Sequence, residues 1–352
     1  MRSHVPANQP VVLTSSLTAT MSSSRPTLMR SLLLTKSEDS LKPSLSFTTK
    51  QPVPVPPPGH LLVKVHASAI QPSDIFNALG GFGSTTFPRV PGRDFSGIVV
   101  ASGDAEASPL LNSAVVGTSG FTHAFTEDGF HAEYAVVPAD GVALKPSALT
   151  HTQAATIGVP FTTAALMVKR SGAEKGDRAL VLGARGAVGS AAAIMLEELG
   201  CQVLRAVRGP GADVDTSADP ELLTVQVLTN KKGVDVVIDT IGVPALTAAA
   251  IDGALAHGGT LVLIAAPKGG SPTLTLKMRD FYRAEKSLIG INSVAHKSSV
   301  MAELLQSLEP IFQSGKWEQA GDGKWKEITL EEAAKVYLDH APGEKFVIKM
   351  QG

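Results

Sequence analysis

The order of apolar and polar residues divides the chain into a strand-rich first part and a second part in which strands and helices alternate. Met29 opens a strand-like run, and the segment 60–70 alternates in the manner of a half-buried strand. Further short apolar runs occupy residues 95–101, 114–117 and 131–137. Short strands at this close spacing, separated by Gly, Pro and Asp, predict a small β-barrel-like domain that ends near residue 150.

Beyond residue 150 the hydrophobic pattern changes. Apolar strand patterns occupy residues 178–183, 202–207, 234–240 and 260–266. Helical patterns lie between them, up to Gly200, near 220–230 and near 244–257. This alternation predicts a doubly wound α/β unit with a parallel sheet. A long helix at 298–314 and a final strand at 345–350 follow. We expect this tail to return to the first domain, so that the α/β unit is an insertion.

The stretch 178–208 is predicted to form strand, glycine turn, helix and strand, the unit that cradles a dinucleotide. Gly186 permits a tight turn, and Gly189 permits close packing of the helix on the strand. The free N–H groups of the first helical turn, near Ala187 and Val188, would then face a pyrophosphate. An ordinary strand-to-helix turn is the alternative, and the flanking strands favour nucleotide binding.

Arg208 ends the second strand of this unit, where dinucleotide folds that select NAD carry an acidic residue for the ribose 2′-OH. A guanidinium there can bind a 2′-phosphate through a charge-assisted fork, so the sequence predicts a preference for NADPH. Arg185, inside the glycine turn, is a second candidate for a phosphate contact. The alternative for Arg208 is a solvated loop residue.

Composition limits the classes of function. A chain of 352 residues is long enough for two domains. The 31 Lys and Arg residues balance the 32 Asp and Glu residues, which gives no bias toward nucleic acid or an anionic membrane. No apolar run reaches the length of a transmembrane helix. The single cysteine, Cys201, excludes an internal disulfide and any multi-cysteine zinc site, and it fits a reducing compartment, the cytoplasm.

Residues 1–28 are rich in Ser, Thr and Pro and contain no Asp or Glu. This composition is the outline of a mitochondrial transit peptide, but Pro6, Pro10 and Pro26 interrupt any amphipathic helix. We favour a disordered extension or an upstream start codon, with the fold beginning near Met29. A mitochondrial location is the alternative.

Six segments occur in an order and spacing that resemble a known family. They read PPPGHLLVKVHASAIQPSD, PRVPGRDFSGIV, DGFHAEYAVVP, AATIGVPFTTAA, VLGARGAVG and GVDVVIDTIG. From about Met29 to Met350 the chain resembles the medium-chain dehydrogenase/reductase superfamily, in particular its zinc-independent quinone oxidoreductase branch. The resemblance implies a GroES-like β-rich catalytic domain (29–152 and 289–352), an inserted Rossmann domain (153–288), a cleft between them for the nicotinamide, and a homodimer.

The resemblance also implies that the catalytic zinc of the related alcohol dehydrogenases is missing. Matched motif to motif, the positions of its Cys, His and Cys ligands hold Gln71, Arg93 and Val159. Valine cannot ligate a metal, and arginine is a permanent cation without a lone pair to offer. The segment 102–114, where the structural-zinc loop would lie, contains no cysteine. We therefore expect a metal-free protein.

Two residues are predicted to act on the substrate. Ser73 matches a relay hydroxyl of the family and could bond the substrate oxygen or the nicotinamide ribose, or else cap a turn. Arg93 could stabilise enolate charge if it faces the cleft, or be structural if it pairs with Asp94 or another carboxylate. Asp74 is expected to be structural. Some quinone oxidoreductases carry a tyrosine where this chain has Phe76, so that proton donor is absent and solvent becomes a candidate source.

The resemblance assigns further residues to the cofactor by their positions in the motifs. Thr163 matches a threonine that touches the nicotinamide ring, with a helix N-cap as the alternative. The remaining positions, at the glycine turn and at later strand ends, are Ala184, Asp239, Ile241, Gly242, Ala265, Ala266, Ile291 and Asn292. Each of the positions at a strand end could also be a plain strand terminus.

These features predict an NADPH-dependent, metal-free reductase that transfers hydride to a quinone or an α,β-unsaturated carbonyl. Two other functions stay open: a trans-acting enoyl reductase that serves a biosynthetic assembly, and a cofactor-binding protein with a regulatory or structural role and negligible turnover. Phenylalanines in and beside the loops 77–88 and 122–130 suggest an apolar substrate pocket, although core packing is the commoner use of Phe.

Overall fold

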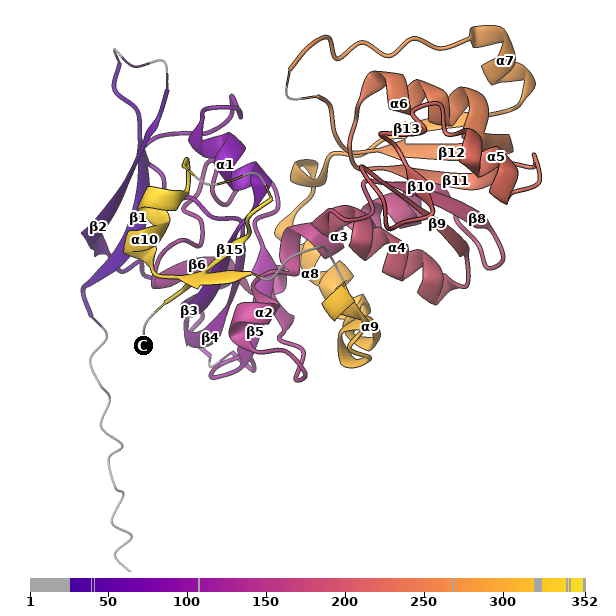
Figure 1. The fold of residues 1–352 in the computed structure, drawn as a ribbon. Helices are drawn as coiled ribbons and strands as arrows, with labels where there is room; N and C mark the ends of the chain where they lie inside the picture. Colours follow the sequence, from indigo (N-terminus) through magenta and orange to yellow (C-terminus); the bar gives the residue numbers. More distant parts are fainter. Residues whose placement is uncertain are drawn as a thin grey trace, which may run out of the picture.

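The computed structural model describes residues 26–350, apart from positions 39, 41, 107, 268, 320–324, 340 and 342. The prediction for the N-terminal extension falls mainly on residues 1–25, which lie outside the described residues. The described chain forms two domains, seen side by side in Figure 1. The predicted α/β architecture, a β-rich domain with an inserted parallel-sheet domain, is confirmed.

The first domain is built on a seven-stranded sheet whose main path runs β14-β15-β3-β4-β5-β7, with β6 paired to β3. Its strands are β3 (His60–Ile70), β4 (Asp94–Ser102), β5 (Ala114–Thr118), β6 (Tyr134–Pro138), β7 (Ala143–Leu144), β14 (Lys326–Ile328) and β15 (Phe346–Lys349). Strand β15 pairs antiparallel with β3, with Phe346 opposite Ile70. The C-terminal segment therefore completes the first sheet, and yellow β15 lies among the violet strands in Figure 1.

Apolar side chains from both ends of the chain share the core of this domain. β1 (Leu28–Thr35) and β2 (Ser44–Pro52) form an antiparallel hairpin, and α10 (Leu330–Val336) packs against it. The largest buried members of the core include Leu32, Leu61, Phe95, Phe130, Leu34 and Tyr337. Because Tyr337 directly follows α10 and Phe95 lies on β4, the C-terminal segment is part of the hydrophobic core rather than an appendage.

The second domain is a six-stranded parallel sheet in the order β10-β9-β8-β11-β12-β13. Its strands are β8 (Arg178–Leu182), β9 (Gln202–Val207), β10 (Val214–Asp215), β11 (Val234–Asp239), β12 (Leu255–Leu263) and β13 (Ser287–Gly290). The chain builds β9 on one side of β8 and later places β11 on the other, so the strand order reverses beside β8. Open parallel sheets bind ligands at the carboxyl ends of the strands at such a reversal.

Helices pack on both faces of this sheet. They include α4 (Ala187–Leu199), α5 (Leu223–Leu228), α6 (Pro244–Ala249) and η2 (Ala250–Ala254), while α7 (Met278–Arg283) contacts η2. α4 shares a core cluster with Val181 on one face, and α5, α6 and η2 share another with Leu180 on the other face. Consecutive residues of β8 thus point to opposite faces, which explains why this strand is apolar throughout.

Two predicted helices are shorter in the structure. The pattern at 298–314 forms two helices, α8 (Ser298–Ser307) and α9 (Glu309–Gln313). Pro310 lacks the N–H that a continuous helix requires, and it lies in the first turn of the second helix, where that N–H is not needed. The pattern at 244–257 ends early, because β12 begins before it is complete.

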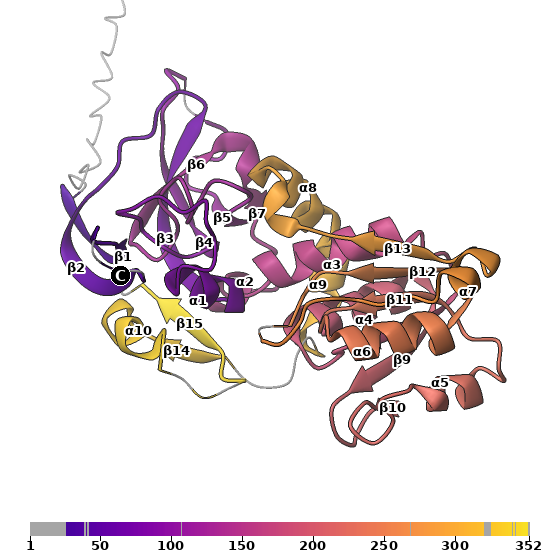
Figure 2. The same cartoon turned by 90° about the horizontal axis from the view of Figure 1, so that it is seen from above.

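α3 (Gly158–Ser171) and α8 lie between the two domains, as Figure 2 shows. α2 (His151–Ala154) leads the chain into α3, and β13 carries the parallel sheet across the expected boundary at residue 288. α8 contacts β5 of the first domain as well as α3. Phe161 of α3 and Phe312 of α9 meet edge to face, with ring centroids 5.1 Å apart. We call this contact between the two domains the seam. Side chains of α3 pack there against side chains of α8 and α9.

Candidate functional site

The glycine turn after β8 has the geometry of a phosphate cradle. Gly183 adopts a φ of +81°, a left-handed conformation that favours glycine. Gly186 is the N-cap of α4, and a Cβ at Gly189 would stand 2.3 Å from the Gly183 carbonyl oxygen, so a side chain there would keep the helix from the strand. The N–H groups of the first turn, from Ala187 on, have no acceptor within the helix. They are the donors that a pyrophosphate requires.

A cavity of about 460 Å³ adjoins this turn at the carboxyl ends of the parallel strands. Its lining comes from these strand ends and the segments that follow them: Gly183, Arg185, Gly186, Val207, Arg208, Thr216, Pro220, Glu221, Ile241, Val243, Ala245 and Leu246. The cavity lies at the reversal of strand order, where this topology binds nucleotides. Four predicted cofactor residues are thus brought together, and the apolar and basic side chains present fit an adenosine phosphate.

The two arginines of this cavity have different surroundings. Arg185 donates from Nη1 to the Arg208 carbonyl oxygen (3.2 Å) and from Nη2 to the Pro210 carbonyl oxygen, so it braces the loop after β9. The Arg208 side chain is exposed at the edge of the cavity. Arg185 therefore shapes the loop that carries Arg208, while the phosphate contacts of both residues stay predictions.

Asp239 holds the turn after β11. Its buried carboxylate accepts hydrogen bonds from the N–H groups of Ile241 and Gly242 (both 2.9 Å) and from the Thr247 hydroxyl (2.6 Å). A Cβ at Gly242 would stand 2.1 Å from the Ala265 carbonyl oxygen, so this turn lies directly against the segment after β12. The structure brings these two groups of predicted residues together, and it uses the Asp239 carboxylate to fix the turn.

Thr163 lies inside α3, so it is not a helix N-cap. Its hydroxyl is buried and has no hydrogen-bond partner among the described residues. A buried unpaired hydroxyl is costly, which makes it a fitting contact for a ligand. Asn292 caps η3 (Ser293–Ala295) through its side chain, and the Ile291 N–H bonds the Leu263 carbonyl oxygen. Contacts of Thr163, Asn292 and Ile291 with a cofactor stay predictions.

Arg93 is the centre of a buried polar cluster in the first domain. Its Nη1 donates to the Ser73 hydroxyl (3.0 Å) and its Nε to the Ser119 hydroxyl (2.9 Å). Ser119 in turn donates to the Gly120 carbonyl oxygen. The guanidinium also lies over the ring of Phe125, 5.8 Å from its centroid. The two predicted catalytic residues, Ser73 and Arg93, are therefore in direct contact.

Two buried carboxyls, Asp74 and Asp94, interact with this guanidinium. Burial raises the pKa of Asp74 to about 7 and the pKa of Asp94 to about 6, while the charge of Arg93 opposes both shifts. Burial lowers the pKa of Arg93, and the two carboxylates oppose that change. The Gln71 N–H bonds one oxygen of Asp74 (2.8 Å), whereas Oδ1 has no partner among the described residues. The cluster thus combines one cation with two weakly acidic carboxyls.

Two of the three positions that carry zinc ligands in the related alcohol dehydrogenases, Gln71 and Val159, are joined here by hydrogen bonds to Asp94. The Gln71 side chain donates to Asp94 Oδ2 (2.9 Å), and the Val159 N–H donates to the same carboxylate (2.9 Å to each oxygen). Within the described part of the chain, no group of three or more His, Cys, Asp or Glu could hold a metal ion. The donor set does not fit zinc, since neither the Arg93 nor the Val159 side chain has a lone pair for a metal.

Sequence reasoning missed several features of this region. Ser119 and Phe125 lie in the segment after β5, where no motif marks them as neighbours of Arg93. A second cavity, of about 620 Å³, lies at the seam between the domains and is lined by both tryptophans of the chain, Trp317 and Trp325. Trp317 lies shortly after α9 and Trp325 directly precedes β14, and no motif marks either tryptophan as part of a cavity.

Family models match both domains. A model described as an alcohol dehydrogenase GroES-like domain matches residues 57–147, and one described as a zinc-binding dehydrogenase matches residues 187–309. A zinc-type alcohol dehydrogenase-like protein of Schizosaccharomyces pombe is 41% identical over 313 residues, which are 88% of this chain and 94% of that protein. The quinone oxidoreductase of Homo sapiens is 29% identical over 276 residues, 75% of this chain and 80% of that protein.

A solved structure of E. coli K-12 YhdH with bound NADPH has a TM-score of 0.70 and 26% sequence identity, covering 91% of this chain and 99% of that chain. No helix in the described residues is both long and apolar enough to cross a membrane. The sequence identity, the matched domains and the order of the strands show that this chain belongs to the medium-chain dehydrogenase/reductase superfamily, a family of oxidoreductases.

Proposed function

We propose that this protein is an NADPH-dependent, metal-free reductase that transfers hydride to a quinone or an α,β-unsaturated carbonyl compound. The observation that carries the proposal is the contact of Arg93 with Ser73 at the place of the zinc site in the related dehydrogenases. Oxidation of an unconjugated alcohol requires a group that activates its hydroxyl, as zinc does in the related dehydrogenases. Reduction of a conjugated acceptor requires stabilisation of the negative charge that its oxygen acquires. The similarity to quinone oxidoreductases supports this acceptor class.

NADPH supplies the hydride when it is bound. We propose that the first-turn N–H groups of α4 hold its pyrophosphate and that the cavity beside Arg208 and Ile241 holds its adenosine half. The buried hydroxyl of Thr163 would lie at the nicotinamide end, and the exposed guanidinium of Arg208 would bind the 2′-phosphate. A related structure that contains NADPH supports this cofactor.

Ser73 and Arg93 are proposed to act on the acceptor oxygen. Because the Ser73 oxygen accepts a hydrogen bond from Arg93 Nη1, its own hydrogen is left to donate to a substrate. The adjacent cation makes that hydroxyl a stronger donor, and a donor held in place stabilises a developing oxyanion better than mobile water does. We expect solvent to deliver the final proton, since Phe76 has no proton to give.

The test is NADPH oxidation with 1,2-naphthoquinone, 9,10-phenanthrenequinone and small enones. Ser73→Ala is expected to lower kcat about 10²-fold, because one oxyanion donor is removed, while the Kd for NADPH stays unchanged. Ser307→Ala is the matched control, since that exposed serine lies on α8 and bonds the Leu304 carbonyl oxygen. Failure of the wild-type protein to oxidise NADPH with any acceptor would contradict the proposal and favour a cofactor-binding protein without turnover.

Arg208→Ala tests the choice of cofactor. Loss of a charge-assisted hydrogen bond to the 2′-phosphate is expected to raise the Kd for NADPH about 10- to 100-fold, with little change in the Kd for NADH. Both constants can be measured by fluorescence titration of the reduced cofactors. Equal affinity of the wild-type protein for NADPH and NADH would refute the role of Arg208.

A further inference from the structure

Three phenylalanine rings lie in series beside Arg93. Phe125 and Phe82 meet edge to face with their centroids 5.1 Å apart, and Phe82 and Phe76 meet in the same way, also at 5.1 Å. Phe125 is the ring that lies against the Arg93 guanidinium. We call Phe76, Phe82 and Phe125 the phenylalanine platform. It connects the proposed catalytic groups to the protein surface through aromatic side chains in mutual contact.

The platform becomes more exposed with distance from Arg93. Phe125 is 2% exposed, Phe82 is half-buried and Phe76 is 47% exposed. The Phe76 ring rests on the backbone of Gly81, where a Cβ would stand 2.4 Å from ring atoms. Burial usually fixes a large apolar side chain in one place, yet this ring is held beside the site while much of it faces solvent. Such a ring is suited to contact a ligand.

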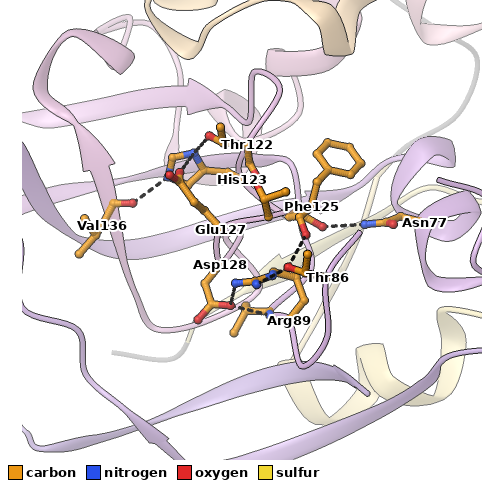
Figure 3. A network of polar contacts seen from close by, with 12 residues as sticks. Asn77, Thr86, Arg89, Thr122, His123, Phe125, Glu127, Asp128 and Val136 are labelled. Atoms are coloured by element: carbon orange, nitrogen blue, oxygen red, sulfur yellow. Dashed lines mark hydrogen bonds and ion pairs between the residues drawn. The ribbon is translucent and has the colours of Figure 1, made fainter. Parts of the chain in front are cut away.

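Hydrogen bonds to backbone carbonyl oxygens join the two segments that carry the platform. The Asn77 side chain donates to the Ala124 carbonyl oxygen (2.7 Å), and the Thr86 N–H donates to the Phe125 carbonyl oxygen (2.9 Å). Figure 3 shows Asn77 to the right of the Phe125 backbone and Thr86 below it. Asn77, in α1 (Pro72–Ala78), and Thr86, in the segment after it, therefore hold the backbone of Phe125 and the residue before it, so the position of Phe125 does not depend on side-chain packing alone.

An ion pair extends this connection. Arg89 Nη1 donates to Asp128 Oδ1 (3.0 Å), and the same carboxylate oxygen accepts from the Val90 N–H (3.0 Å). In Figure 3 this pair lies below Phe125 in the same network. The platform is thus built on a hydrogen-bonded scaffold before any substrate arrives, which lowers the entropic cost of binding a rigid ligand.

We propose that the phenylalanine platform makes this reductase selective for planar aromatic acceptors, such as polycyclic quinones, over small aliphatic enones. Planar rings pack favourably on aromatic faces and edges, and phenylalanine offers no hydrogen bond that would favour a polar chain. The acceptor oxygen would meet Ser73 and Arg93 at the inner end of the platform. This inference rests on the proposed reductase function and adds its substrate class.

The kinetic test compares two acceptors in three proteins. The ratio of kcat/KM for 9,10-phenanthrenequinone to kcat/KM for 3-buten-2-one is measured in the wild type, in Phe76→Leu and in Tyr282→Leu. Phe76→Leu is expected to lower this ratio about 3- to 10-fold, the size of one aromatic contact. Tyr282 is an exposed aromatic residue on α7 of the other domain, so Tyr282→Leu should leave the ratio unchanged.

The outcomes separate this inference from the proposed function. Reduction of both acceptors with a ratio that Phe76→Leu and Phe82→Leu leave unchanged would overturn the platform and leave the reductase standing. Reduction of neither acceptor would overturn the reductase. Because Phe76 is exposed, its replacement is not expected to impair folding, and a thermal melt of each variant verifies this.

A binding measurement tests the platform without turnover. We expect the protein to bind 2-naphthol at least about 3-fold more tightly than its saturated counterpart decahydro-2-naphthol, and Phe76→Leu to remove most of the difference. The two compounds share a hydroxyl and a carbon skeleton and differ in planarity and aromaticity. Equal affinity for both, or a difference that survives in Phe76→Leu and Phe82→Leu, would show that the platform does not select aromatic rings.

Discussion

The Arg93 guanidinium interacts electrostatically with two buried carboxyls, Asp74 and Asp94. Its charge therefore stabilises the folded first domain, in addition to its proposed role toward the substrate. Asp74 and Asp94 have raised pKa values of about 7 and 6 even with this cation beside them. Removing one member of a buried charged group leaves the others without compensation, which is costly. The serine contacts of Arg93 therefore explain its proposed role, and the carboxyls explain why arginine is tolerated in the interior.

Arg93→Met is expected to lower the free energy of unfolding by about 3–5 kcal/mol at pH 8, because Asp74 and Asp94 lose their counter-charge. The loss should be smaller near pH 5, where both carboxyls are protonated in the folded state. Urea unfolding at the two pH values measures both effects. Arg205→Met, which removes an exposed pair with Glu197, is the control and should cost at most about 1 kcal/mol.

His131 is a second buried residue whose charge state the fold determines. Its Nε2 bonds the Ala69 carbonyl oxygen (3.1 Å), which only accepts, so Nε2 carries the hydrogen. Its Nδ1 therefore accepts from the Tyr337 hydroxyl (3.0 Å). Burial lowers the pKa of His131 to about 4, so the imidazole is neutral over the whole physiological range.

This pKa shift predicts a stability loss in acid. Between pH 6.5 and about 4 the unfolded state binds a proton at His131 that the folded state does not bind. The contribution of the neutral His131 to the free energy of unfolding is therefore fully present above pH 6.5 and is lost as the pH falls toward 4. The free energy of unfolding of the wild type relative to His131→Gln should fall by about 3 kcal/mol over this interval. Urea unfolding at a series of pH values measures the difference, and a pH-independent difference would contradict the neutral imidazole.

Among the elements, the turn between β8 and α4 is the one most dependent on a single residue type. Gly189→Ala is expected to weaken NADPH binding at least about 10-fold and to lower the melting temperature, because a Cβ there meets the Gly183 carbonyl oxygen. Gly253→Ala in η2 is the matched control, since the nearest atom to a Cβ at that position is the Glu221 carbonyl oxygen, at 3.7 Å. Unimpaired NADPH binding by Gly189→Ala would place the pyrophosphate elsewhere.

The strongly periodic elements could be predicted from the sequence, and the short or interrupted ones could not. The glycine turn and its flanking strands carry local signals, because their spacing and residue types are set by the turn itself. The pattern at 298–314 stayed apolar across Pro310, so periodicity alone joined two helices. β13 and β14 are short, and their pairing depends on partners that are distant in the sequence.

The candidate site, too, could be predicted only in part from the sequence. Motif position indicates Ser73 and Arg93 separately, and the structure shows that the two are in contact. No motif indicates that Ser119 and Phe125 approach the same guanidinium. Those contacts depend on how the segment after β5 folds back on α1, which no local pattern specifies. Asp239 illustrates the reverse case, since a carboxylate at a strand end suggested a ligand contact and the structure uses it to fix a turn.

For the whole molecule, the seam between the domains is a packed contact that also contains an open space. α3 contacts strands of both sheets, and the cavity of about 620 Å³ lies beside it. Because Trp317 and Trp325 are the two tryptophans of the chain and both line this cavity, intrinsic tryptophan fluorescence reports on the seam rather than on the core of either domain.

The pairing of β15 with β3 also sets the order in which the protein can be assembled on the ribosome. β3 emerges early, while β15 and Tyr337 emerge only after the complete nucleotide-binding domain. Until then the part of β3 that pairs with β15, from Ala67 to Ile70, is open at one edge, and His131 lacks its tyrosine partner. An open strand edge invites pairing with another chain. The inserted domain has its own sheet and can fold first, so the first domain closes only after the inserted domain and β15 have been synthesised.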